Sequence, residues 1–238
     1  MRRWLVSFGT LLLALPAQAY RPFDSTDADV ADAGELETEL GYFTVAHFRG
    51  EDTYLIPKVV LNYGITDTLE IIGEFDVEKA RGRSAEIVDA ALLLKGMLRR
   101  GVLQDEQGLS VAFEAGLLVP SADGDRSGFE GIGIVSGELA GVTYHLNFGG
   151  GIDTADTARF VVWGAILERP LNRGLRLVGE INGEKVKGEP DQRSALLGFI
   201  WESASPGDAF DGGIRWGISD TAPDWELTLG WTFSFPRR

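Results

Sequence analysis

The stretch WELTLGWTFSF, residues 225–235, decides the fold because an apolar or aromatic side chain stands at every second position. Successive side chains of an extended chain point to opposite faces, so this stretch has one apolar face and one polar face. It is longer than the roughly 5–6 residues of an average strand in a soluble protein. A tilted strand that crosses a bilayer needs about 9–11 residues, and the stretch suits that role.

The same two-residue alternation recurs along the chain, whereas helical periodicity is scarce after residue 19. The chain has 31 glycines, and short clusters of Gly, Asp, Pro and Ser recur at fairly even intervals, as expected for strands that are joined by turns. No stretch in the middle of the chain has the composition of a linker, so we expect one domain. We predict strands at residues 34–48, 53–65, 67–79, 84–98, 108–119, 129–140, 142–152, 158–169, 174–186, 193–202, 210–219 and 224–235.

Strands with one apolar face fit two architectures. In a soluble β-sandwich the apolar face is the interior, whereas in a membrane barrel it faces lipid and the polar face lines the lumen. The predicted segments, of roughly 10–15 residues, and the aromatic residues near their ends favour the barrel. Because lipid offers no partner to an unpaired backbone amide, such a sheet must close on itself.

We therefore predict an all-β fold, a single transmembrane antiparallel β-barrel of about 12 strands with up-and-down topology. An even number of strands places both chain ends on the periplasmic side of a bacterial outer membrane, which is the expected location. The lipid bilayer is then a partner of the chain. A soluble periplasmic β-protein is the alternative.

Residues 1–19, MRRWLVSFGTLLLALPAQA, have the three parts of a secretory signal peptide: basic residues, an apolar run and the small-residue site Ala17-Gln18-Ala19. The apolar run is shorter than the roughly 20 residues of a membrane-spanning helix, so we expect cleavage before Tyr20 and not a retained anchor. Cleavage changes the net charge from −14 to −16, because only Arg2 and Arg3 are lost. This acidity argues against nucleic acid as a partner. The chain has no cysteine, so no disulfide stabilises it.

The start of the mature chain has a distinctive order of residues. Arg21-Pro22-Phe23 is followed by Asp27, Asp29 and Asp32 and then by Gly34-Glu35-Leu36-Glu37. This order resembles the start of barrels in the family named for the meta-cleavage pathway of phenol degradation. The resemblance implies an outer-membrane channel or transporter without a defined substrate. Residues 20–33 then form a periplasmic tail or a plug in front of the barrel, which covers residues 34–235.

The end of the chain resembles the β-signal by which the outer-membrane assembly machinery recognises barrels. The pattern is a polar residue, a Gly two residues later and two aromatic residues near the end, here Thr228, Gly230, Phe233 and Phe235. In the usual pattern the last aromatic residue closes the chain, whereas here residues 236–238 follow as a C-terminal tail. The resemblance implies the assembly machinery as a second partner.

Most charged residues in the predicted strands fall on the polar face. A carboxylate in a lumen needs a cation or water, so these residues indicate salt-bridge ladders or a hydrated channel. We hypothesise a narrow, acidic channel or transporter that admits small solutes; a structural or anchoring barrel without flux is the alternative. The lumen-lining candidates are Glu35, Glu37, Glu39, Lys58, Glu70, Glu74, Asp76, Asp89, Lys95, Glu114, His145, Arg176, Glu180, Asp211, Arg215 and Glu226.

Two motifs bear on other chemistry. Asp123, Asp125, Ser127 and Gly128 resemble the first half of a calcium loop, but the twelfth position is Ile134 instead of Glu, so we expect an ordinary polar turn and no metal. His145 lies on a polar face, and a lipid-modifying outer-membrane enzyme is a further alternative. No serine motif accompanies His145, so we expect neither an enzyme nor a bound cofactor.

Overall fold

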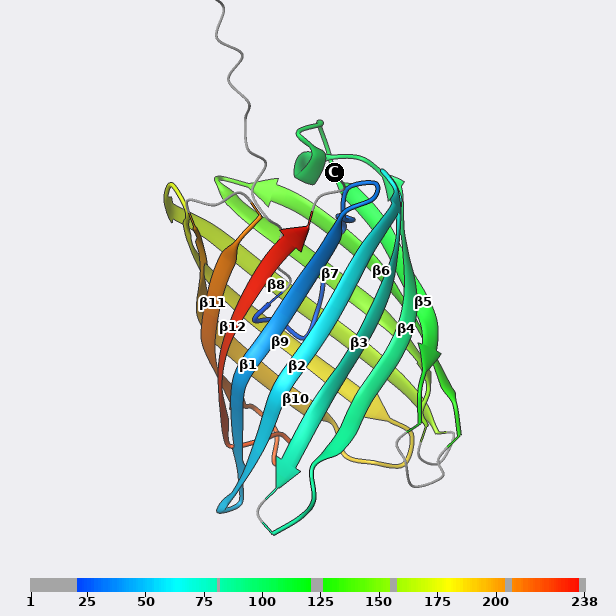
Figure 1. The fold of residues 1–238 in the computed structure, drawn as a ribbon, viewed down its shortest axis with the longest axis vertical. Helices are drawn as coiled ribbons and strands as arrows, with labels where there is room; N and C mark the ends of the chain where they lie inside the picture. The colour runs from blue at the N-terminus through cyan, green and yellow to red at the C-terminus, as the bar shows by residue number, and fades with distance from the viewer. Residues whose placement is uncertain (1–20, 81, 121–125, 155–157, 204–206, 236–238) are drawn as a thin grey trace, which may run out of the picture.

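The structure is a computed structural model that describes residues 21–80, 82–120, 126–154, 158–203 and 207–235. Within these residues twelve strands form one closed antiparallel barrel with up-and-down order, in which β12 pairs with β1 (Figure 1). This confirms the predicted fold class. The strands are β1 (Leu36–Phe48), β2 (Glu51–Thr66), β3 (Leu69–Ala80), β4 (Glu86–Arg99), β5 (Ser110–Leu118), β6 (Gly128–Leu139), β7 (Val142–Ile152), β8 (Arg159–Asn172), β9 (Leu175–Val186), β10 (Gln192–Glu202), β11 (Ala209–Gly217) and β12 (Trp225–Phe235).

Each predicted strand corresponds to one observed strand, and the boundaries agree to within three residues. The largest difference is in β8, which continues past Pro170 because a register shift between Pro170 and Asn172 accommodates it. Pro57, inside β2, also lies at a register shift, between Leu55 and Lys58. Proline has no N–H to donate to the ladder, so the pairing slips at these positions.

Several predictions concern residues outside the described part of the chain. These are the signal peptide at residues 1–19, Tyr20, the C-terminal tail at residues 236–238, and Asp123 and Asp125 of the turn that resembles a calcium loop. Among the described residues, no helix is long and apolar enough to cross a bilayer. A short 3-10 helix, η1 (Val102–Gln104), lies in the connection between β4 and β5.

The wall of the barrel has an apolar outside and a largely polar inside. On β4, for example, Leu92 and Leu94 are exposed, whereas Leu93 and Lys95 are buried. Because side chains alternate along a strand, one row of each strand covers the outer surface and the other row lines the lumen. The outer row carries most of the exposed aromatic and aliphatic residues, among them Phe113, Leu117, Phe148, Leu167, Trp201 and Phe235.

The lumen also contains apolar clusters. One consists of Val178, Leu196, Ile200 and Ala209, with Phe23 packed against it. A second contains Ala28, Ala112 and Ile134, and a third contains Ile72, Ala91 and Leu93. Inward Phe160 and Ile166 explain why the sequence of β8 is apolar on both faces. The inner wall is therefore a mixture of charged and apolar regions.

The barrel has two distinct ends. Leu36 at the start of β1 pairs with Phe235 at the end of β12, and we call this the terminal end of the barrel. At the opposite end, β1 and β2 are joined by the tight turn of Arg49 and Gly50, with positive φ angles of 50° and 89°. This pair of left-handed residues matches the twist of a two-residue hairpin. Figure 1 shows the terminal end at the top.

Candidate functional site in the barrel lumen

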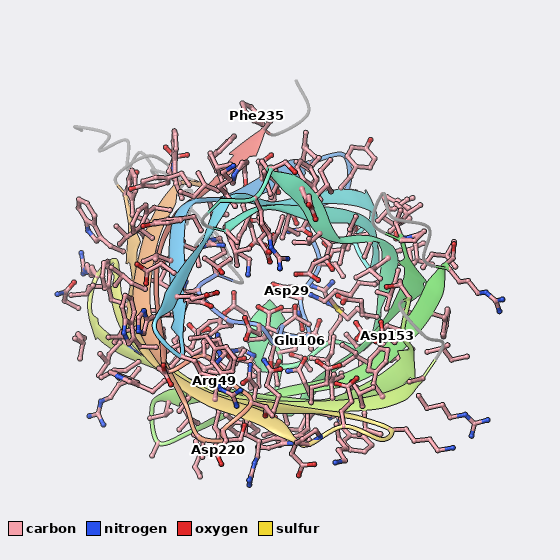
Figure 2. All side chains as sticks on the ribbon, turned by 90° about the horizontal axis from the view of Figure 1, so that it is seen from below. Asp29, Arg49, Glu106, Asp153, Asp220 and Phe235 are labelled. Carbon is pink, nitrogen blue, oxygen red and sulfur yellow. The ribbon has the colours of Figure 1, made fainter. Side chains whose placement is uncertain are left out.

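Residues 21–34, here called the N-terminal segment, lie inside the barrel. Figure 2, a view along the barrel, shows Asp29 within the ring of strands. Backbone amides of the segment donate hydrogen bonds to side chains of five different strands, so the segment follows the inner wall around the lumen. The pairs are Arg21 to Glu39 (3.2 Å), Ser25 to Glu180 (2.8 Å), Thr26 to Asn147 (3.2 Å), Ala28 to Ser136 (3.0 Å) and Ala31 to Glu70 (2.7 Å).

Arg21 begins the described chain and lies against β1, β11 and β12. Its Nη2 donates a 2.6 Å hydrogen bond to Thr228 Oγ1, and its Nε lies 3.6 Å from Asp211 Oδ2. Two glycines leave room for the guanidinium group: a Cβ at Gly41 would lie 2.4 Å from Nη1, and a Cβ at Gly230 would lie 2.3 Å from Nε. The wall is thus shaped to hold this cation.

The acidic residues of the segment meet cations of the wall. Arg215 Nη1 lies 3.0 Å from Asp24 Oδ2, while its Nη2 lies 2.8 Å from Glu180 Oε2. Asn182 donates a 2.8 Å hydrogen bond to the same Asp24 oxygen. A buried arginine with two carboxylate partners holds both in a fixed position, so Arg215 joins the segment to β9 and β11.

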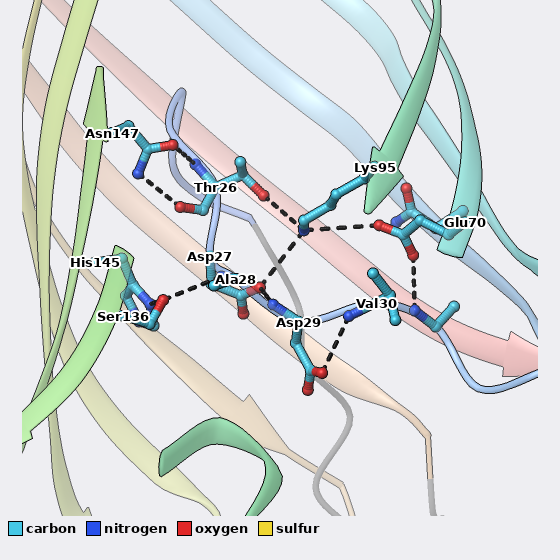
Figure 3. Close-up of polar contacts among 12 residues, drawn as sticks. Thr26, Asp27, Ala28, Asp29, Val30, Glu70, Lys95, Ser136, His145 and Asn147 are labelled. Carbon is cyan, nitrogen blue, oxygen red and sulfur yellow. Dashed lines mark hydrogen bonds and ion pairs between the residues drawn. The ribbon is translucent and has the colours of Figure 1, made fainter. Parts of the chain in front are cut away.

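Lys95 is the second such cation, and its side chain is fully buried. Its Nζ lies 3.6 Å from Asp27 Oδ1 and 3.6 Å from Glu70 Oε1, and it donates a 3.2 Å hydrogen bond to Thr26 Oγ1 (Figure 3). The other oxygen of Glu70 accepts the Ala31 amide. Lys95 and Glu70 of the wall therefore hold the segment at two places: Lys95 contacts Thr26 and Asp27, and Glu70 accepts the amide of Ala31.

A third polar group lies nearer the terminal end. Ser136 Oγ accepts the Ala28 amide and lies 2.8 Å from His145 Nδ1. His145 Nε2 lies 3.3 Å from Glu168 Oε1, and Arg176 Nη1 lies 2.9 Å from Glu168 Oε2. This chain of contacts runs from the segment through β6, β7 and β8 to β9. The order serine, histidine, carboxylate is that of a hydrolase triad, but the two ring nitrogens of His145 are used the other way round: Nδ1 contacts the serine and Nε2 the carboxylate.

The β4–β5 connection covers the segment at the terminal end. Gln104 of η1 donates a 2.8 Å hydrogen bond to Asp29 Oδ1, and Leu103 packs against the cluster that contains Ala28. Burial, together with the negative charge of Asp27, raises the pKa of Asp29 to about 6. The segment is therefore held from the lumen wall and from this connection.

A cavity of about 350 Å³ lies in the lumen next to the segment. Residues 21 and 23–26 form one side of it, and the rest of the lining comes from β1 to β7. Asp89, close to the opposite end of the barrel, is exposed and belongs to the lining. Five acidic side chains that line the cavity come from β3 to β6: Glu74, Asp76, Asp89, Glu114 and Glu130.

The structure divides the predicted lumen residues into three groups. Those in contact with the segment are Glu39, Glu70, Lys95, Glu180, Asp211 and Arg215. Those that line the cavity are Lys58, Glu74, Asp76, Asp89 and Glu114, together with Glu39 of the first group, and Lys58 is paired with Asp76 at 3.3 Å. The others lie elsewhere: Glu35 just before β1, Glu37 beside Asn62, His145 and Arg176 in the serine–histidine group, and Glu226 on β12.

Several residues that take part in these contacts were not among the predicted lumen-lining candidates. Glu130 lies on the glycine-rich strand β6, and Glu168 lies on β8, whose two faces are both apolar over most of its length. Neither strand has a clear polar row, so their inward residues could not be read from alternation. Ser136 and Asn147 are uncharged, and only their contacts with the segment distinguish them from other polar residues.

The residues that resemble a β-signal, Thr228, Gly230, Phe233 and Phe235, lie on β12. Gly230 is buried on the lumen side, where it contacts Arg21, whereas Phe235 is exposed on the outside. The rings of Phe233 and Phe235 are in edge contact, with centroids 5.3 Å apart. In the part of the chain that the structure describes, no group of three His, Cys, Asp or Glu residues is arranged to hold a metal ion.

No protein-family model and no curated protein sequence matches the chain. Solved structures do match it. An outer-membrane channel from Pseudomonas putida F1 has a TM-score of 0.62 and 13% sequence identity, over 90% of this chain and 100% of that chain. The NanC porin has a TM-score of 0.60 and 7% identity, over 83% of this chain and 98% of that chain. At such low identity the similarity shows a common fold.

Proposed function

We propose that the protein is a channel of the bacterial outer membrane that passes small cations or polar solutes, with the N-terminal segment limiting passage. The apolar outer surface and the polar lumen suit a barrel in a bilayer. The fold shared with an outer-membrane channel and a porin supports this function. The order of residues 21–37 further supports membership of the family named for the meta-cleavage pathway of phenol degradation.

The observation that carries the proposal is the charge of the cavity lining. Five carboxylates of β3 to β6 line the cavity, and the cation Lys58 is already paired with Asp76. A passage that is lined by one sign of charge concentrates ions of the other sign. We therefore expect cations to be favoured over anions.

Planar-bilayer recordings of the purified barrel test this function. In a potassium chloride gradient we expect a reversal potential of the sign that indicates cation preference. Replacing Glu74 and Glu114 together by glutamine should reduce that preference. The control Glu51→Gln, at the end of the barrel opposite the terminal end, should not. An anion preference would contradict the proposed cation selectivity, and no current from either the full chain or a chain without residues 21–33 would leave a structural barrel as the better interpretation.

We also propose the cellular location and the mode of assembly. The outer surface of β12 and the pattern Gly230, Phe233 and Phe235 support recognition by the outer-membrane assembly machinery. Fractionation of membranes, combined with heat-modifiable mobility on gels, should find the protein folded in the outer membrane. Phe235→Ala should reduce the folded fraction more than the substitution of an exposed aromatic residue in another strand, such as Phe148→Ala.

We propose that the serine–histidine–glutamate group holds the segment and does not catalyse hydrolysis. Ser136 is fully buried, and its Oγ already accepts the Ala28 amide. A nucleophile must reach its substrate, and this hydroxyl is covered. Phospholipid and ester hydrolysis assays should show no activity that depends on His145. Activity that is abolished by both His145→Ala and Ser136→Ala would establish an enzyme instead.

A further inference from the structure

The lining of the cavity beside the N-terminal segment combines acidic and apolar side chains. The acidic ones include residues of β3 to β6. The apolar ones come from the segment and from β2, β3 and β6. The apolar residues of the lining are Phe23, Val60, Ile72 and Ile132.

Four acidic side chains of the lining have no partner among the described residues: the exposed Asp89 and a group of three that lie deeper. Glu74, Glu114 and Glu130 form no side-chain hydrogen bond and no ion pair there, although Glu114 is only 8% exposed. Glu74 interacts electrostatically with Glu114 and Glu130, so the three carboxylates lie close to one another. A carboxylate that is removed from bulk water is costly unless a cation or a donor accompanies it.

The cations nearest to this group are engaged elsewhere. Lys58 is paired with Asp76, and Lys95 is paired with Asp27 and Glu70. Arg21 also lines the cavity, but its guanidinium group contacts Thr228 and Asp211. The lining thus has an excess of negative charge, which Lys58 and Lys95 compensate only in part.

We propose that this cavity binds a small organic cation, an ammonium or guanidinium group carried on a short apolar body. The charge lies against Glu74, Glu114 and Glu130, and the apolar body lies against Phe23 and its aliphatic neighbours. An aromatic ring also attracts a cation that approaches its face. A volume of about 350 Å³ is at the lower end of the roughly 300–1,000 Å³ of ligand pockets, so the occupant is small.

The proposal names the solute class of the channel and to that extent rests on the proposed function, but binding itself requires no flux. Because Phe23 and its neighbours at residues 24–26 line the cavity, the bound cation also contacts the N-terminal segment. Titration calorimetry on the purified barrel in detergent micelles therefore tests the site directly. Benzylammonium is the probe, and benzyl alcohol and benzoate have a similar body without the positive charge.

We expect benzylammonium to bind at least about tenfold more tightly than benzyl alcohol, benzoate or potassium, since a charged hydrogen bond contributes about 1.5–3 kcal/mol. Glu114→Gln and Glu130→Gln should each weaken binding about ten- to a hundredfold. Glu138→Gln, an exposed position on the same strand as Glu130, is the matched control and should leave binding unchanged. Heat-modifiable mobility identifies variants that are folded, and half-buried Glu130 provides the test if Glu114→Gln does not fold.

Equal affinity for benzylammonium and benzyl alcohol, or no effect of Glu130→Gln beyond that of Glu138→Gln, would overturn the site. Bilayer recordings separate this inference from the proposed function. Cation current without benzylammonium binding rejects the site alone. Binding without any current retains the site and rejects the channel.

Discussion

Lys95 of β4 and Asp27 of the N-terminal segment form an ion pair in the middle of the polar contacts inside the barrel, with Nζ 3.6 Å from Oδ1. The same Nζ lies 3.6 Å from Glu70, whose other oxygen accepts the Ala31 amide. The wall and the segment thus share one charge network, in which the fully buried Lys95 is the cation partner of both Asp27 and Glu70. Loss of the lysine leaves two buried acids without their cation.

Lys95→Met is therefore expected to release the segment. Breaking a buried ion pair by removal of one partner costs about 3–5 kcal/mol, because the other charge stays buried and unpaired. Limited proteolysis should cut within residues 21–34 of the variant much faster than in the wild-type protein. The matched control is Lys185→Met, since Lys185 and Asp191 form an ion pair that is half exposed and contributes little. Equal protection of the segment in wild type and Lys95→Met would contradict the role of this network.

Much of the barrel could be predicted from the sequence because alternation is a local property. In β5 the inward residues Ala112 and Glu114 and the outward residue Phe113 can be assigned from the sequence alone. The prediction was weakest for β6 and β8, where glycines or apolar residues occupy both faces. The inward positions of Glu130 and Glu168 follow there only from pairing with neighbouring strands.

The path of the N-terminal segment could not be predicted in the same way. Residues 21–34 have no periodicity, and their partners, such as Arg215 and Ser136, are more than a hundred residues away in the sequence. One signal was present but ambiguous: glycines at inward positions of the wall. Gly41, Gly164 and Gly230 stand where a Cβ would collide with the segment, but a glycine in a strand has several other causes.

Deletion of residues 21–33 is expected to increase the single-channel conductance of the barrel. These residues occupy the lumen and contact most of the strands, so their removal widens the passage for ions. Planar-bilayer recordings compare the deleted chain with the full chain at the same salt concentration. Asp24→Ala in the full chain provides an intermediate, because only the contacts of the Asp24 side chain with Arg215 and Asn182 are lost. An unchanged conductance after the deletion means that the segment does not limit the current.

Gly64→Ala is expected to push the segment away from β2. A Cβ at this position would lie 2.1 Å from the carbonyl oxygen of Asp32 and 2.4 Å from that of Ala31, and backbone atoms cannot move aside easily. Such overpacking typically costs about 1–3 kcal/mol. Gly73→Ala on the neighbouring strand is the control, because a Cβ there meets nothing within 4 Å. Hydrogen exchange of the Ala31 amide should be faster in Gly64→Ala and unchanged in Gly73→Ala. Equal exchange in the two variants would show that the close approach is not maintained in solution.

Docking of the segment is expected to strengthen on acidification from pH 7 to pH 5. The pKa of Asp29 is raised from 3.8 to about 6, so the docked segment binds a proton more tightly than the free segment does. The cost of ionised Asp29 is therefore absent below about pH 4, grows as the pH rises and is complete above about pH 6.

Besides burial, the neighbours that set this pKa are the charged side chains of Asp27 and Lys95, the side-chain amide of Gln104 and the backbone amide of Val30. Asp29→Asn keeps an oxygen that accepts hydrogen bonds but removes the titration. Bilayer recordings of both proteins at pH 7 and pH 5 measure the open fraction. We expect it to fall on acidification more strongly in the wild type than in Asp29→Asn, and the variant should be the less open of the two at pH 7. The same pH dependence in both proteins would place the titrating group elsewhere in the lumen.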